Sequence, residues 1–480
     1  MHYADNSNHP QKRQKRHHSS HSRPRPPPIE TEEEDREDYC RGGYHFVKVG
    51  DRYKDGQYLV IRKLGWGHFS TVWLVQDQRT LKHFAMKVQK SAKHYREAAL
   101  DEIQLSERVA KADPNALGAQ YVTAIVDHFS IDGPNGNHVC MIFEVLGENL
   151  LELLRKSHHE GLRVRLVKQI AKQVLLGLDY LHRTCKIIHT DLKPENVMTY
   201  LDNAEEILRD ASVPVMEPAE DQDEDDSRGR SRTRKSNRHV NLVASQPLSL
   251  DSKRDAEKKQ GRKRSWSTRS EESVVSSRLR SLEKINVKIA DLGNACWVDQ
   301  HFTEAIQTRQ YRSPEVIFGA KWDATADIWS LACMIFELLT GDFLFDPQKG
   351  RYFDRDEDHL ALMIELLGPM PPKFALSGEH SKDFFDYRGE LRHIKRLKYW
   401  PLEDVLRKKY GFHSREAEEI ASFLTPMLRY ENRAQARDML DHPWLNGVEP
   451  ILEGERQDKE AWRGLQRPWR EWEKRRNRRY

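Results

Sequence analysis

The chain has 480 residues, of which 38% are apolar and 32% are charged, and its formal net charge is +4. The low apolar share indicates a folded core combined with polar segments that cannot bury one. No apolar run suits a secretory signal or a membrane span, so we expect a soluble intracellular protein. The five cysteines are scattered without metal-ligand spacing, which predicts reduced thiols and excludes a disulfide framework.

The predicted elements run from strands to helices along the chain. Residues 1–37 are rich in His, Arg, Ser and Pro and then in acids, which predicts a disordered tail, with order beginning near Tyr44. Strands are expected over 58–75, around a Gly-rich turn, and over 84–88 and 139–145. Apolar spacing predicts a helix through Ala99, Ile103 and Leu105, and an amphipathic helix over 167–181. This order predicts an α+β fold with a small antiparallel sheet lobe and a larger, mostly helical lobe.

A polar block divides the second lobe. Residues 202–283 hold an acidic run followed by serines mixed with basic residues, which predicts a long disordered spacer. The expected organisation is therefore a small lobe over 38–146 and a large lobe over 147–201 and 284–445. Residues 446–480 form a basic tail that contains several tryptophans. This tail could bind RNA, act as a nuclear signal, or pack loosely on the large lobe.

The strongest motif lies at residues 189–196, which read HTDLKPEN. Phosphoryl transfer needs a carboxylate to accept the proton of the attacking hydroxyl, a cation beside the moving phosphate, and an oxygen ligand for Mg²⁺. Asp191, Lys193 and Asn196 supply these three groups on one loop. We interpret the loop as catalytic, with Asp191 as the base.

A second Mg²⁺ ligand is expected at Asp291, which opens the tripeptide Asp-Leu-Gly after a short apolar strand. The tripeptide alone is weak, because it is common in turns. It becomes specific after the loop at Asp191, even with the spacer between them. Asn196 and Asp291 are therefore the predicted metal ligands.

The Gly-rich segment at residues 64–72 predicts a phosphate-binding turn, because glycines let the backbone approach phosphates closely. A strand is expected after it instead of the helix of a dinucleotide fold. Lys87 follows at the distance typical of protein kinases and would hold the α- and β-phosphates. Glu102 is the chosen acidic partner of Lys87, with Asp101 and Glu97 as neighbouring alternatives.

Three further residues are expected to have structural roles. The run at 308–315 fits the end of an activation segment. Glu315 would be buried there and need a cation, for which Arg433 is the natural partner. Asp327 opens an apolar helix and could anchor the catalytic loop by hydrogen bonds.

From about residue 38 to 445, apart from the spacer, the chain resembles the SR protein kinases, which phosphorylate arginine/serine-rich splicing factors. The specific segments are DYCRGGYH at 38–45, KLGWGHFSTVW at 63–73, FEVLG at 143–147 and ADLGNACW at 290–297. The resemblance implies a bilobal fold, ATP with Mg²⁺, and a serine of an Arg-Ser repeat as acceptor. The spacer resembles one that governs nuclear entry in this family, so we expect a location in cytoplasm and nucleus.

The resemblance also implies the binding residues. Those for ATP are Leu64, Gly65, Gly67, Val72, Ala85, Lys87, Phe143, Glu144 and Leu146. An acidic docking groove is implied at Asp342, Asp358 and Glu365, with Lys409 nearby. The acid-dense run at 354–358 agrees in part, because arginines pair with such acids, although a charge run can also be a solvated face.

One residue departs from the general kinase pattern. Thr190 stands where an Arg usually precedes the catalytic Asp and pairs with a phosphate on the activation segment. Because Thr cannot form that ion pair, we expect an enzyme that is active without activation-segment phosphorylation.

Three other functions remain open from the sequence. They are a related kinase of the LAMMER or Dyrk kind, a pseudokinase scaffold for Arg-rich partners, and an RNA-binding protein. The intact set of Lys87, Asp191, Asn196 and Asp291 argues against the scaffold. We expect a monomer with no membrane partner and no direct nucleic-acid binding, although the basic tail leaves nucleic acid open.

Overall fold

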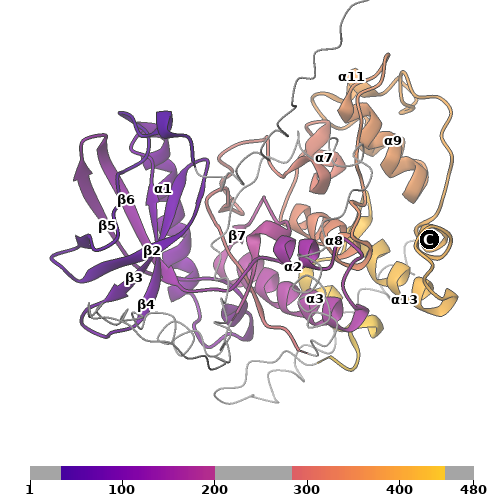
Figure 1. The fold of residues 1–480 in the computed structure, drawn as a ribbon. Helices are drawn as coiled ribbons and strands as arrows, with labels where there is room; N and C mark the ends of the chain where they lie inside the picture. Colours follow the sequence, from indigo (N-terminus) through magenta and orange to yellow (C-terminus); the bar gives the residue numbers. More distant parts are fainter. Residues whose placement is uncertain (1–33, 201–283, 449–480) are drawn as a thin grey trace, which may run out of the picture.

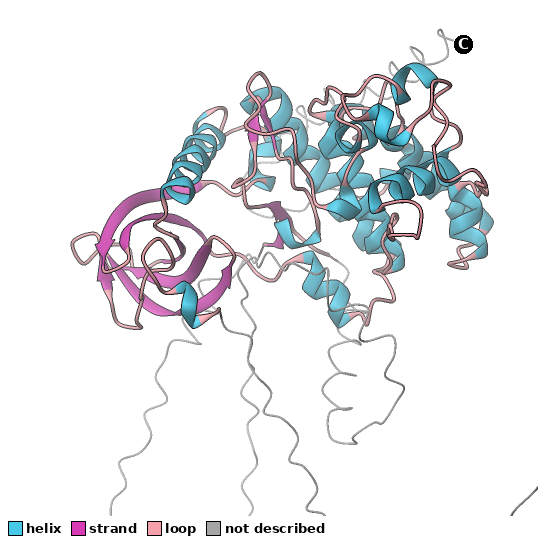
Figure 2. Cartoon of the chain, turned by 90° about the horizontal axis from the view of Figure 1, so that it is seen from above, coloured by secondary structure: helices cyan, strands magenta, loops and turns pink. Residues whose placement is uncertain are grey.

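A computed structural model describes residues 34–200 and 284–448 in two lobes (Figure 1). The predicted spacer and most of the two predicted tails lie outside the described residues. Seen from above, the main sheet forms one lobe and most of the helices form the other (Figure 2). Among the described helices, none combines the length and apolar character that a membrane span requires.

The small lobe is a six-stranded antiparallel sheet with the strand order β1-β2-β3-β4-β6-β5. Its strands are β1 (Arg52–Tyr53), β2 (Tyr58–Gly67), β3 (Ser70–Asp77), β4 (His83–Gln89), β5 (Ile125–Gly133) and β6 (Gly136–Glu144). One helix, α1 (Lys93–Lys111), buries Ala99 and Ile103 against Val139 and Met141 of β6. This packing fixes the helix that carries Glu102 to the sheet.

The large lobe is built around two buried helices, α3 (Val164–Asp179) and α8 (Thr325–Thr340). Helix α8 is apolar on all sides and buried along almost its whole length, as expected of a central helix. The other helices are α2 (Leu150–Lys156), α7 (Pro314–Ile317), α9 (Arg355–Leu367), α10 (Pro372–Ala375), α11 (Ser381–Phe384), α12 (Leu402–Lys408), α13 (Ser414–Leu424) and α14 (Ala436–Met439). Most of these elements contribute to a single large apolar core.

Two short strand pairs flank the predicted catalytic loop at residues 189–196. Strand β7 (Ile187–Ile188) pairs with β10 (Cys296–Trp297), and β8 (Val197–Thr199) pairs with β9 (Val287–Ile289), both antiparallel. The chain reaches β9 from β8 only through residues 200–286. The catalytic loop and the segment that begins at Asp291 are therefore held side by side across that long interval.

The fold confirms the predicted α+β class and its two lobes, and it corrects the predicted start of order. The described chain begins at Glu34, ahead of Tyr44. Glu34 is buried and forms an ion pair with Lys63 of β2, and Asp38 pairs with Lys90. The composition of residues 1–37 predicted a disordered tail, because composition does not reveal that Glu34 has a cationic partner on β2.

Candidate active site

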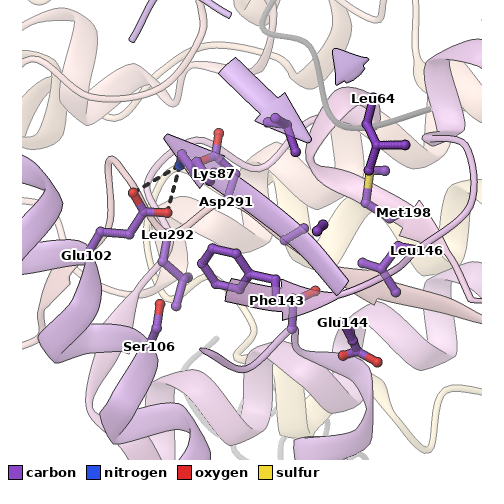
Figure 3. A pocket seen from close by; sticks show the side chains of 14 residues that line it. Leu64, Lys87, Glu102, Ser106, Phe143, Glu144, Leu146, Met198, Asp291 and Leu292 are labelled. Atoms are coloured by element: carbon purple, nitrogen blue, oxygen red, sulfur yellow. Dashed lines mark hydrogen bonds and ion pairs between the residues drawn. The ribbon is translucent and has the colours of Figure 1, made fainter. Parts of the chain in front are cut away.

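A pocket between the lobes collects most of the predicted nucleotide-binding residues (Figure 3). It is lined by Leu64, Val72, Ala85, Lys87, Glu102, Ser106, Thr123, Phe143, Glu144, Leu146, Met198, Ala290, Asp291 and Leu292. Predicted residues Gly65 and Gly67 lie on β2 and are not among the lining residues. The sequence prediction missed Ser106, Thr123, Met198, Ala290 and Leu292, which come from four separate stretches and share no motif that marks a pocket wall.

Lys87 of β4 joins the two lobes at the back of this pocket. Its Nζ lies 2.7 and 2.9 Å from the carboxylate oxygens of Glu102 and 3.1 Å from Oδ1 of Asp291. The choice of Glu102 over Asp101 and Glu97 is therefore confirmed as the partner of Lys87. Burial alone would lower the pKa of Lys87, but the charges of Asp291 and Glu102 raise it above its ordinary value.

Asp291 is kept ionised by the same cation. Burial opposes its charge, but Lys87 lowers its pKa below the ordinary value of a carboxyl. Its backbone has a φ of 64°, and the preceding residue, Ala290, donates its N–H to the carbonyl of Asn196 at 2.9 Å. An anionic carboxylate is thus held beside the catalytic loop, where it can ligate a divalent cation.

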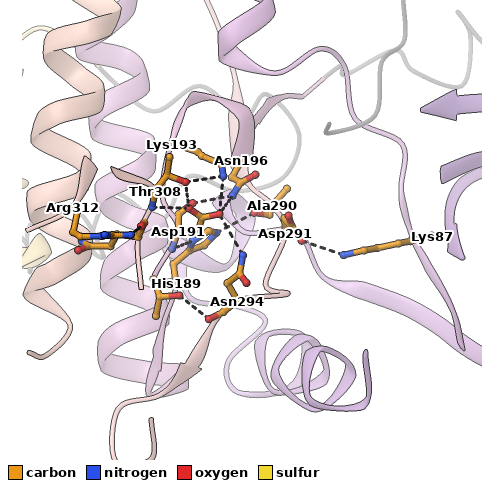
Figure 4. A network of polar contacts seen from close by, with 12 residues as sticks. Lys87, His189, Asp191, Lys193, Asn196, Ala290, Asp291, Asn294, Thr308 and Arg312 are labelled. Carbon is orange, nitrogen blue, oxygen red and sulfur yellow. Dashed lines mark hydrogen bonds and ion pairs between the residues drawn. The ribbon is translucent and has the colours of Figure 1, made fainter. Parts of the chain in front are cut away.

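Asp191 lies in a network of donors (Figure 4). Its Oδ1 accepts a hydrogen bond from the hydroxyl of Thr308 at 2.7 Å, and its Oδ2 accepts one from Nζ of Lys193 at 2.8 Å. Lys193 also donates to the Thr308 hydroxyl at 3.0 Å. Asn294 approaches Oδ2 at 3.3 Å. Thr308 and Asn294 were not predicted here, because only the folded chain brings the activation segment against Asp191.

Asn196 is oriented by the same loop. Its Nδ2 donates to the backbone carbonyl of Asp191 at 2.8 Å, which leaves the amide oxygen for a cation. An amide oxygen and a carboxylate suit Mg²⁺, which is usually held by few protein ligands together with substrate phosphates. Within the described ranges, no cluster of three or more His, Cys, Asp or Glu could hold a metal by itself. Asn196 and Asp291 thus fit a cation that is shared with a nucleotide.

The catalytic loop is suspended from Asp327 at the start of α8, as predicted. Its carboxylate accepts the backbone N–H groups of His189 and Thr190 at 2.8 and 2.9 Å, and it lies 2.7 Å from Nε2 of His182. Burial would raise the pKa of Asp327, but the contact with His182 lowers it. The anchor compensates for the left-handed backbone of Thr190, whose φ is 65°.

The activation segment makes hydrogen bonds to backbone carbonyls and to a side-chain amide. Gln307 donates to the carbonyl of Ala326 at 2.9 Å, and its side-chain oxygen accepts the N–H of Ser313 at 2.9 Å. Arg312 donates to the backbone carbonyls of Ile306 and Gln307 at 3.1 and 2.9 Å. The hydroxyl of Thr190 donates to a backbone carbonyl, that of Asn294, at 2.7 Å. These hydrogen bonds join the segment to the start of α8 and to the catalytic loop.

The predicted pair of Glu315 and Arg433 is confirmed. Nη1 and Nη2 of Arg433 lie 2.6 and 2.9 Å from the two carboxylate oxygens of Glu315, and both side chains are buried. This bidentate pair joins α7, at the end of the activation segment, to the loop before α14.

The predicted docking residues lie on two parts of the large lobe. Asp358 and Glu365 share one face of α9 through their i, i+7 spacing. Burial raises the pKa of Asp358, and the nearby charges of Glu365 and Asp346 raise it further. Asp342, just after α8, accepts a hydrogen bond from the hydroxyl of Tyr410 at 3.0 Å and lies 3.6 Å from Nζ of Lys409.

The acid-dense run at 354–358 is largely occupied by local contacts. Asp354 caps α9, Asp356 pairs with Arg309, and buried Glu357 contacts His393 at 2.6 Å. Three of its four acids are thus satisfied inside the chain. The fourth, Asp358, accepts the backbone N–H of Gln348 at 2.7 Å.

Residues 58–209 and 279–445 match the protein kinase domain family. Together with the bilobal fold and the arrangement of Lys87, Asp191 and Asp291, this match defines a protein kinase. Protein kinases use ATP and Mg²⁺.

The curated relatives narrow the class. Serine/threonine-protein kinase SRPK of Physarum polycephalum is 47% identical, with 88% of this chain and 94% of that protein aligned. Protein kinase dsk1 of Schizosaccharomyces pombe is 44% identical over 88% of this chain and 86% of that protein. SRSF protein kinase 3 of Mus musculus is 41% identical over 86% and 91%. The chain therefore belongs to the SR protein kinase family of serine/threonine kinases.

Proposed function

We propose that this kinase transfers the γ-phosphate of ATP to serines in arginine/serine-rich proteins, with Asp191 as the catalytic base. The observation that carries this proposal is the network around Asp191. Lys193 and Thr308 hold its carboxylate in one position, so a serine hydroxyl that enters there meets an oriented acceptor for its proton.

The bond changes follow from that arrangement. The serine oxygen bonds to the γ-phosphorus, the bond from that phosphorus to its bridging oxygen breaks, and the hydroxyl proton passes to Asp191. Lys193 lies beside the base and offsets charge on the transferring phosphoryl group, and Lys87 holds the α- and β-phosphates. Bound Mg²⁺ would be held by Asn196 and Asp291 and would neutralise phosphate charge.

The adenine would occupy the apolar part of the pocket. Leu64, Val72 and Ala85 would cover the ring from the sheet, with the backbone of Gly65 and Gly67 above the phosphates. Phe143 would close the back of the pocket, and the backbone of Glu144 and Leu146 would hydrogen-bond to the ring. The apolar lining supports this assignment, because ligand pockets combine such walls with few placed polar groups.

The acceptor class is supported by the family and by the acids of the large lobe. Asp358 and Glu365 on one face of α9, and Asp342 with Lys409 nearby, form the proposed docking surface for an Arg-rich segment. Arginine pairs with carboxylates through a planar fork, so a run of arginines suits two acids on one helix face.

We expect strong transfer from ATP to an Arg-Ser repeat peptide in Mg²⁺, and a loss of at least about 1,000-fold in kcat for Asp191→Ala, because the base and its network disappear together. Radiolabelled phosphate transfer measures both proteins side by side. Ser-Pro peptides and a tyrosine-containing peptide serve as controls for the related LAMMER and Dyrk kinases. A wild type that binds ATP but transfers nothing to the Arg-Ser peptide would contradict the proposal.

We further propose that the enzyme needs no phosphate on its activation segment. Support comes from Gln307 and Arg312, which hold that segment through backbone and amide groups, and from Thr190, which cannot pair with a phosphate. Protein made in bacteria and treated with phosphatase should therefore retain full activity toward the Arg-Ser peptide. Mass spectrometry of the intact segment confirms that phosphate is absent before the assay. Activity that appears only after phosphorylation would overturn this proposal.

A further inference from the structure

A segment outside the matched kinase domain contacts the Gly-rich turn of the small lobe. Residues 34–46, here called the N-terminal strap, precede the first matched residue, which is 58. The hydroxyl of Tyr44 donates a hydrogen bond to the backbone carbonyl of Gly67 at 2.7 Å, and Tyr44 is only 1% exposed. Gly67 ends the β2 side of the Gly-rich turn. The strap thus holds the end of β2 at this turn through a buried hydrogen bond.

The strap also caps the helix that carries Glu102. The backbone carbonyls of Gly42 and Gly43 accept the N–H groups of Ala92 and Ser91 at 2.9 and 3.1 Å. Ala92 is the N-cap residue of α1 and has no side chain that could cap it. The first four N–H groups of a helix, counted from the N-cap, need outside acceptors, and the strap supplies one for the N-cap residue.

Lys90 contacts two residues of the strap, Asp38 and Tyr44. It lies between β4 and α1, and its Nζ is 2.9 Å from Oδ2 of Asp38 and 4.2 Å from the centre of the Tyr44 ring. At the tip of the Gly-rich turn, the ring of Phe69 lies 5.4 Å from the ring of Tyr95 on α1. The turn, α1 and the strap therefore meet in one cluster.

The strap is anchored at its start as well. Glu34 is buried and pairs with Lys63 of β2, and Tyr39 donates to the same carboxylate. The ring of Tyr39 stacks on that of Phe46 at 4.7 Å. Burial raises the pKa of Tyr44, and the charges of Asp38 and Glu34 raise it further. The hydroxyl therefore stays protonated and donates its hydrogen to the carbonyl of Gly67.

We propose that the N-terminal strap positions the nucleotide phosphates by coupling the Gly-rich turn to α1, with Tyr44 as the positioning residue. Tyr44 does not line the pocket and acts only through Gly67. The turn and Glu102, which orients Lys87, are then held by one segment instead of by a phosphorylated loop or a partner protein. This inference rests on the proposed nucleotide site.

Tyr44→Phe tests the inference because it removes only the hydroxyl. We expect the KM for ATP to rise about five-fold, as for the loss of one buried hydrogen bond, with the KM for the Arg-Ser peptide within about two-fold of wild type. Tyr58→Phe is the matched control. Tyr58 is also buried in the small lobe, 2% exposed, and its hydroxyl donates to Asp127 at 2.7 Å, far from the turn. Its KM for ATP should not change.

A second variant and a second measurement complete the test. Lys90→Met removes the ion pair with Asp38 and should weaken ATP in the same direction as Tyr44→Phe. Binding of a fluorescent ATP analogue with Mg²⁺ gives the Kd without catalysis, so it tests the strap even if the peptide assay fails. Equal losses of thermal stability in Tyr44→Phe and Tyr58→Phe, with ATP affinity unchanged in both, would reduce the strap to a structural support and overturn the inference.

Discussion

The pair of Arg433 and Glu315 illustrates how a single side chain can support the activation segment from outside it. Both side chains are buried, and the guanidinium of Arg433 also lies 4.9 Å from the ring of Trp329 in α8. Two charges in the interior are tolerated only because each satisfies the other. The pair therefore stabilises the lobe only while it is complete.

Arg433→Met should lower the free energy of unfolding by about 3–5 kcal/mol, because it leaves the carboxylate of Glu315 buried without a cation. Urea denaturation followed by tryptophan fluorescence measures the change. Arg415→Met is the matched control, because Arg415 pairs with Glu419 on the exposed face of α13. Similar unfolding midpoints for the two variants would show that the buried pair contributes no more to stability than the exposed pair does.

At the level of single residues, the chemistry of the site was largely predictable from the sequence. Asp191, Lys193, Asn196, Lys87 and Asp291 stand in motifs whose residue types phosphoryl transfer requires. Thr308 and Gln307 were not predicted as contacts of the site, because a hydroxyl or an amide at one position does not reveal which distant loop it will meet. Their contacts join segments that are far apart in the chain.

Among the elements, helix α9 contains a titratable side chain, His359, that is buried in an apolar environment. His359 is fully buried, 5.4 Å from the ring of Phe345, and neither of its ring nitrogens has a hydrogen-bond partner among the described residues. Burial, with smaller effects from Arg309 and Arg312, lowers its pKa to about 3. The folded protein therefore keeps this histidine neutral where the unfolded chain protonates it.

The sign of the pH dependence follows. The folded pKa lies below the unfolded value, so acid favours the unfolded chain, and stability falls as the pH drops below about 6.5. Between pH 7.5 and pH 5, the free energy of unfolding of wild type should fall by about 2 kcal/mol more than that of His359→Leu. Urea unfolding at both pH values measures this. An unchanged pH dependence in His359→Leu would contradict the prediction.

Elements with a clear apolar period were predicted well, and irregular ones were not. The predicted helix over 167–181 begins earlier, at Val164, and gives way to a π-helical turn at Tyr180–Cys185. That turn places His182 against Asp327 and ends at Lys186, whose φ is 62°. The apolar pattern cannot show such a turn, because its cause is a tertiary contact with the start of α8.

For the whole molecule, the interval between β8 and β9 is the main departure from a continuous domain. Val197 pairs with Ile289 and Thr199 with Val287, and the N–H of Tyr200 donates to the carbonyl of Asn286 at 2.8 Å. The two ends therefore already meet as a hairpin does. Both lobes were predictable from the order of strands and helices, but this direct meeting of the ends was not, because the sequence shows only their separation.

Replacing residues 202–283 by a four-residue Gly-Asn linker should leave the kinase domain intact, because the ends are already paired. We expect an unfolding midpoint no lower than that of the full chain and a KM for ATP within about two-fold of it, in the range expected for a loop change away from the site. Differential scanning fluorimetry and peptide kinetics measure both. A strongly destabilised variant would show that the replaced residues contribute contacts to the fold.

The same interval has a consequence for synthesis. Strand β8 leaves the ribosome long before its partner, and at about 5–20 residues per second the delay is on the order of 10 s. During that time Gln173 of α3 also lacks its partners, since it binds the backbone of Ile285 and Val287. The first half of the large lobe must therefore stay soluble while Gln173 still lacks these hydrogen bonds, so this part of the nascent chain is open to chaperones until Ile285 and Val287 emerge.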